Sequence, residues 1–160
     1  MPFADAHTSE GNDINDLGEM VGGSDSPSGL YRAIYKSPVG GRNIFFYDLG
    51  VLGAGTANAG NRSVAFAISA KGLIVGQSNL KVGQYFQNRA FVVSNQGNAG
   101  SQPMLNLTEQ SWVLVGGNWQ RADANGWMLT SAERINREGW IVGYGTKSGQ
   151  TRAFVLSPRQ

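Results

Sequence analysis

A chain of 160 residues, 41% of them hydrophobic and 15% charged, has enough apolar material for one core and too little charge for an extended disordered segment. Thirteen Lys and Arg against eleven Asp and Glu leave a formal charge of +2 with no basic stripe, which argues against a nucleic-acid partner. The chain has no cysteine, His7 is its single histidine, and no apolar run approaches the roughly 18 residues of a membrane helix. We therefore expect no cofactor, no metal site and no membrane span.

A phrase of the form Ile-x-x-x-Gly-x-x-x-Gly occurs three times, beginning at Ile14, Ile68 and Ile135. In each copy an Asn-x-x-Gly or Ser-x-x-Gly turn precedes an apolar return strand. Such a turn, with Gly at the position of positive φ, is typical of a β-hairpin. Each copy is therefore expected to begin with a hairpin.

An Arg-Ala-apolar phrase follows each hairpin, at 32–34, 89–91 and 152–154. Around it, bulky or apolar residues occupy both alternating faces, which predicts a strand that is buried on both sides within stacked sheets. Polar segments of varied length separate the phrases, and we expect them to be surface loops.

A fourth strand is expected in the first two copies, at 46–50 and 104–108, whereas the third copy reaches Gln160 without one. Residues 2–6 are one candidate for the missing strand. Three units of roughly four strands each have the content of β-propeller blades. An all-β, propeller-like repeat protein is therefore the predicted fold, and a closed β-barrel or β-sandwich is the alternative.

Self-similarity at a fixed period indicates one repeat domain over residues 1–160. Its parts are repeat 1 at about 10–55, repeat 2 at about 63–109, a Trp-bearing insertion at about 110–127 and repeat 3 at about 128–158. Propellers have about four to eight blades, so three units predict either a homodimer that completes a ring or a piece of a longer chain.

The pattern Ala-x-x-Ile-Asn-x-x-Gly-x-Ile-Val-Gly, followed by x-Ala-Phe and Asp-Leu-Gly-x-Leu-Gly, resembles the HAF-repeat family of extracellular bacterial repeat proteins. The resemblance covers residues 12–53, 63–108 and 127–158, with Arg in place of the His of the tripeptide that names the family. It implies a β-propeller-like repeat and an extracytoplasmic setting. It implies no catalytic residue.

The repeat arginines Arg32, Arg89 and Arg152 lie at matching points of the three units. In a ring they would face matching directions, and a cluster of guanidinium groups binds carboxylate, phosphate or sulfate bidentately. The alternative, which we favour, is that each arginine pairs with a local acid or a turn carbonyl and fixes strand register. Asp48 and Glu133 are the acids expected to pair with them.

The insertion carries Trp112, Trp119 and Trp127, interleaved with polar residues that include Arg121 and Asp123. Insertions in repeat proteins often form the binding surface. Trp119, Arg121 and Asp123 are therefore candidate ligand-binding residues, with an indole suited to stacking against a sugar ring. Trp112 and Trp127 are alternatively core residues, because large aromatic side chains dominate apolar burial.

These patterns favour a non-enzymatic binding or interaction module for a glycan or an anionic ligand, with a carbohydrate or a protein as partner. No catalytic residue is predicted, since a Ser-His-Asp triad would depend on His7 alone. One alternative is a small carbohydrate-active hydrolase with two facing carboxylates. Another is a structural protein that self-assembles through unpaired strand edges.

Overall fold

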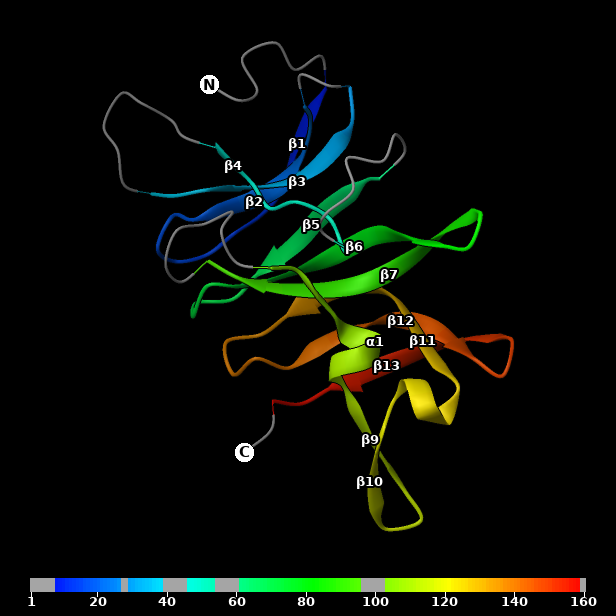
Figure 1. Cartoon of the computed structure of the whole chain (residues 1–160). Coiled ribbons are helices and arrows are strands. Elements are labelled where there is room, and N and C mark those ends of the chain that lie inside the picture. Colours follow the sequence, from blue (N-terminus) through cyan, green and yellow to red (C-terminus); the bar gives the residue numbers. More distant parts are fainter. Residues whose placement is uncertain (1–7, 27–28, 39–45, 54–60, 96–102, 159–160) are drawn as a thin grey trace.

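The computed structural model of the protein describes residues 8–26, 29–38, 46–53, 61–95 and 103–158, and in this part of the chain it is all-β, as predicted. The strands form four small antiparallel sheets, none of which closes on itself (Figure 1). His7 and the candidate strand at 2–6 lie outside the described residues.

Three of the sheets follow the chain in simple sequential order. The first contains β1 (Ser9–Ile14), β2 (Met20–Asp25), β3 (Tyr31–Lys36) and β4 (Phe46–Asp48). The second contains β5 (Ser63–Ile68), β6 (Leu73–Val82), β7 (Tyr85–Ser94) and β8 (Leu105–Asn106). The third contains β11 (Trp127–Ile135), β12 (Ile141–Lys147) and β13 (Gln150–Leu156).

The fourth sheet is a separate hairpin of β9 (Trp112–Val115) and β10 (Asn118–Arg121). It is preceded by the short helix α1 (Leu107–Gln110) and followed by a 3-10 turn at Asp123–Asn125. Among the described residues, no helix is long and apolar enough to cross a membrane.

The three larger sheets lie one on another, with the second in the middle (Figure 1). Cluster I fills the space between the first and second sheets and contains Val21, Ala33, Tyr35, Leu49, Leu52, Ala65, Ile68, Ile74, Phe91, Val93 and Met104. Cluster II lies between the second and third sheets and contains Ala67, Val75, Ala90, Leu107, Leu129, Ala132, Ile141 and Phe154. The middle sheet is therefore buried on both faces.

The Arg-Ala-apolar strands behave differently in the three sheets. In β7, Phe91 belongs to cluster I and Ala90 to cluster II, so this strand is buried on both faces, as predicted. In β13, Phe154 packs in cluster II but Val155 points the other way and is 62% exposed. The prediction of two buried faces is thus wrong for β13, because nothing described covers the outer face of the third sheet.

In the second strand of each of the three larger sheets, a glycine at the equivalent position has no room for a side chain. The first strand carries a β-bulge beside it, and a Cβ added to Gly22, Gly76 or Gly143 would lie 1.9, 2.1 or 2.0 Å from a carbonyl oxygen of that strand. On its other side the glycine pairs with the apolar residue of the Arg-Ala-apolar phrase. Phe91 lies opposite Gly76 and Phe154 opposite Gly143, each ring within 2.9 Å of the Cβ position.

Polar side chains add a second set of links between the stacked sheets. The Asn12 side-chain amide donates to the Ala65 carbonyl (2.9 Å), and the Asp13 carboxylate accepts from the Ile68 backbone N–H (2.9 Å). These bonds join β1 of the first sheet to the backbone of β5, the edge strand of the second sheet. They fix the position of the first sheet along the second.

The fourth strand of the second repeat is shorter than the predicted 104–108. Only Leu105 and Asn106 pair with β7, and the chain then turns into α1. The Asn106 side chain accepts from the Thr108 backbone N–H (3.1 Å) and donates to Glu109 (2.8 Å), which caps the helix. Asn106 at the helix N-cap therefore ends the strand, although the alternation of apolar and polar residues alone predicts that the strand continues to residue 108.

We expect Gly76→Ala to lower the free energy of unfolding by about 3 kcal/mol, because its Cβ would overlap the Val64 carbonyl oxygen and the Phe91 ring. Urea denaturation followed by circular dichroism measures the change. Gly83→Ala is the matched control, since it meets no atom within 4 Å and costs only the strain of its positive φ, about 1 kcal/mol. Equal losses in the two variants would contradict the packing role of Gly76.

Candidate binding site

The β9–β10 hairpin forms because two glycines supply its turn. Gly116 and Gly117 have φ of 56° and 81°, the two positive values that a two-residue type I′ turn requires. A Gly-Gly pair between two β-rich segments is a hairpin signal within the Trp-bearing insertion at about 110–127. The hairpin projects away from the stacked sheets (Figure 1).

Two indoles lie on one face of this hairpin. In its register Trp112 pairs with Arg121 and Trp119 pairs with Leu114, so Trp112, Trp119 and Arg121 share a face, with the two indoles in diagonal positions. Trp112 is 45% exposed and Trp119 is 62% exposed. The hairpin therefore presents two large aromatic side chains to solvent within reach of one ligand.

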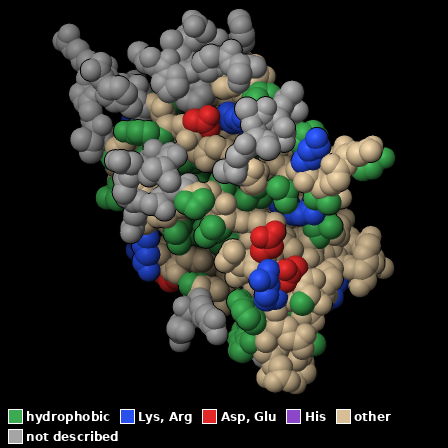
Figure 2. All heavy atoms as spheres, in the orientation of Figure 1, with side chains coloured by type: hydrophobic (Ala, Val, Ile, Leu, Met, Phe, Trp, Pro, Cys, Tyr) green, Lys and Arg blue, Asp and Glu red, His purple; other side chains and the backbone are tan. Residues whose placement is uncertain are grey.

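An ion pair lies at the base of the same hairpin. The Arg121 guanidinium binds the Asp123 carboxylate bidentately, with Nε to Oδ1 at 3.1 Å and Nη2 to Oδ2 at 2.8 Å. These hydrogen bonds hold the pKa of Asp123 below its ordinary value and raise that of Arg121. Figure 2 shows acidic and basic side chains side by side here, next to hydrophobic side chains along the hairpin.

The third tryptophan anchors this segment to the core. Trp127 packs against cluster II, and the Lys147 ammonium lies 5.6 Å from the centre of its ring. Lys147 also donates to the Asn125 carbonyl (2.8 Å). The core alternative therefore holds for Trp127, whereas Trp112 belongs to neither core cluster.

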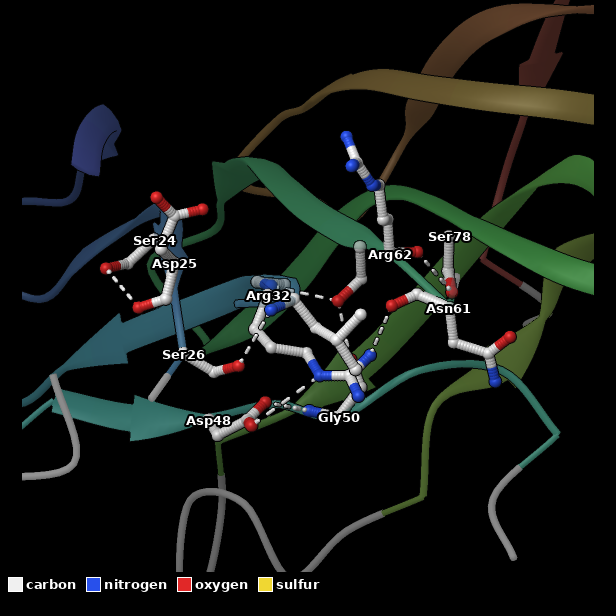
Figure 3. Close-up of polar contacts among 12 residues, drawn as sticks. Ser24, Asp25, Ser26, Arg32, Asp48, Gly50, Asn61, Arg62 and Ser78 are labelled. Carbon is white, nitrogen blue, oxygen red and sulfur yellow. Dashed lines mark hydrogen bonds and ion pairs between the residues drawn. The ribbon is translucent and has the colours of Figure 1, made fainter. Parts of the chain in front are cut away.

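The repeat arginine of the first sheet contacts oxygen atoms of its own sheet and of the segment that leads into the second sheet. Figure 3 shows the Arg32 guanidinium between Asp48 of β4 and the segment before β5. Its Nη1 donates to the Asn61 carbonyl (2.7 Å), and its Nε lies 3.9 Å from the Asp48 carboxylate. Arg32 thus links the first sheet to the start of the second.

The other two repeat arginines bind residues of their own strands. Arg89 is buried and donates to the Gln87 side chain (2.6 Å) and the Asn88 carbonyl (3.0 Å); burial lowers its pKa. Arg152 is exposed and donates to the Gln150 side chain. None of these partners is an acid or a turn carbonyl, and each lies in the same strand as its arginine, so the register role and anion binding by the three arginines both stay predictions. Glu133, an expected acidic partner, accepts instead from the Ser131 hydroxyl (2.6 Å).

A buried carboxylate that the sequence analysis did not single out joins the first two sheets. Glu19 accepts from the Tyr35 hydroxyl (2.8 Å) and from the side-chain amides of Asn15 (2.6 Å) and Asn95 (2.7 Å). The other two copies have Leu73 and Trp140 at this position, so an acid in place of an apolar residue was the available signal. With three donors around it, Glu19 is a structural carboxylate.

A shallow hollow of about 190 Å³ lies where the hairpin turns of the three repeats meet. The side-chain oxygens of Asn15, Ser69 and Asn136 line it, and each accepts a backbone N–H of its own turn. Asp16 and Arg137 form an exposed ion pair at its edge (3.6 Å). Because these polar groups already serve the turns, the β9–β10 hairpin is the better candidate site.

Neither similarity to known proteins nor a metal site indicates a function. The chain matches no protein-family model, no curated protein and no solved structure. Within the described ranges, no group of three or more His, Asp or Glu side chains is arranged to hold a metal ion.

Replacing equivalent arginines should have unequal effects. We expect Arg89→Met to lower the free energy of unfolding by about 2 kcal/mol, because two hydrogen bonds from a buried charged group are lost. Arg152→Met, at the exposed equivalent position, should stay within about 0.5 kcal/mol of the wild type. Chemical denaturation measures both. Equal stability of all three proteins would contradict a stabilising role of the buried Arg89.

Proposed function

We propose that the protein is a non-enzymatic binding module of propeller-like repeat architecture, and that its ligand surface is the Trp112–Trp119 face of the β9–β10 hairpin. Three stacked sheets with the same strand order and the same glycine beside a bulge support the repeat architecture. Blades of a propeller are small antiparallel sheets of this kind. The resemblance to the HAF-repeat family points in the same direction.

The observation that carries the binding role is the exposure of Trp119 and Trp112 on one hairpin face. Both side chains lie outside the two core clusters, so packing of the described core does not require them there. Exposed Trp and Arg are the residues that dominate binding energy at interfaces. The base of the hairpin is closed by the backbone N–H of the buried Ala122, which donates to the Ser111 carbonyl (2.9 Å), so the two indoles are presented on a short hairpin with a fixed base.

A glycan is the ligand class that this surface fits best. The apolar face of a sugar ring packs on an indole, and its hydroxyl groups need donors and acceptors close by. Arg121 supplies guanidinium donors and Asp123 supplies carboxylate acceptors at the base of the same hairpin. The pair is ionised at neutral pH, because each partner shifts the pKa of the other toward the charged form.

We expect Trp119→Ala to weaken binding of the best ligand on a glycan array at least about tenfold, the loss typical of a truncated interface tryptophan. Titration followed by tryptophan fluorescence measures the affinity. Trp140→Ala is the matched control, since Trp140 is also exposed but lies on the β11–β12 turn. The affinity of this variant for the glycan should equal that of the wild type.

Three results would contradict this proposal. Unchanged affinity in Trp119→Ala would remove the hairpin from the binding surface. Binding of peptides with no glycan bound would overturn the ligand class. Shortening of the bound glycan during prolonged incubation, measured by mass spectrometry, would contradict a non-enzymatic role.

A further inference from the structure

We call the forward face of each larger sheet the face that carries one particular apolar pair, formed between neighbouring residues of its second and third strands. These pairs are Val21–Tyr35, Val75–Val92 and Val142–Val155. The first pair belongs to cluster I and the second packs in cluster II. In the first two sheets, the forward face is thus covered by the next sheet along the chain.

The forward face of the third sheet is also apolar, but no sheet among the described residues covers it. Val21 and Val75 are fully buried, whereas Val142 is 40% exposed and Val155 is 62% exposed. Tyr144, two residues beyond Val142 and therefore on the same face, is also exposed. Large exposed apolar patches on monomers mark interaction sites.

The two internal interfaces show what covers a forward face. In each case the next sheet brings an apolar pair from its first and second strands, Ile68–Ile74 in cluster I and Ile135–Ile141 in cluster II. The first sheet carries the corresponding pair, Ile14–Met20. Ile14 is 64% exposed although its equivalent Ile68 is 5% exposed.

We propose that the forward face of the third sheet binds a second copy of this chain through the Ile14–Met20 patch of its first sheet. The contact repeats the chemistry of the two internal interfaces, with Val142 and Val155 in the places of Val75 and Val92. Ile34, also on the first sheet, is already buried and is not accessible to a second copy. The contact between the two copies is therefore centred on Ile14 and Met20, next to the β1–β2 turn. This inference is independent of the ligand bound by the hairpin.

The contact is heterologous, because two different patches meet. Each copy carries both patches, so two copies that face each other about a two-fold axis satisfy both contacts at once, and a geometry that does not close adds further copies. Six stacked sheets in such a pair are within the range of a closed propeller.

Light scattering on a size-exclusion column tests the proposal with charge variants. The wild type should have the mass of at least two chains, and Val155→Glu and Ile14→Glu should each be monomeric, because a buried unpaired charge is strongly unfavourable. An equimolar mixture of Val155→Glu and Ile14→Lys should form dimers, since one contact keeps Ile14 against Val155 and in the other the two introduced side chains carry opposite charges. Both residues are exposed in the single chain, so both variants should keep the wild-type circular dichroism spectrum.

Val82→Glu is the matched control, since Val82 is an exposed valine at the β6–β7 end, away from both patches, and should associate like the wild type. A monomeric wild type would overturn the proposal. So would an Ile14→Glu variant that still associates, because that result indicates two forward faces in contact. A mixture that stays monomeric would also overturn it. Trp119→Ala should associate normally, which separates this result from the test of glycan binding.

Discussion

The contact on which the stack depends is a glycine between a bulged strand and an aromatic ring. Gly76 lies so close to the Val64 carbonyl that no side chain fits, and the space above it is filled by Phe91. The same arrangement recurs at Gly143 with Phe154, and Gly22 has the same close approach opposite Ile34. In each sheet the glycine lets the first strand approach closely on one side, and the apolar residue of the third strand fills the space on the other side. The sheets can then pack closely against one another. Dense packing of this kind is sensitive to a single added methyl group.

The stack separates the molecule into a rigid body and a projecting element. The second sheet is buried on both faces, and hydrogen bonds from the Asn12 side-chain amide and the Asp13 carboxylate of β1 hold the first sheet against it. The β9–β10 hairpin has no such covering, and all four residues of β10 are exposed. The candidate binding surface therefore lies on an element that is expected to open more easily than the stacked sheets.

Much of this fold could be predicted from the sequence, because its signals are local. Glycines at positions 18, 72 and 139 adopt the positive φ that the three predicted hairpins require. Alternation could not show which sheets lie at the ends of the stack, so the exposure of Val155 was not predicted. The candidate residues Trp119, Arg121 and Asp123 stood out because they interrupt the repeat. The partner of Arg32, the Asn61 carbonyl, depends on how two sheets meet, and no local pattern contains that information.

The most direct test of the stacked arrangement is amide hydrogen exchange of the native protein, measured by NMR at a concentration where a single chain predominates. The account predicts that β6 and β7 amides exchange most slowly and only through global unfolding, because both faces of their sheet are buried. Amides of β9 and β10 should exchange orders of magnitude faster through local opening. Equal rates in β7 and β10, or slowest exchange in β13, would contradict it.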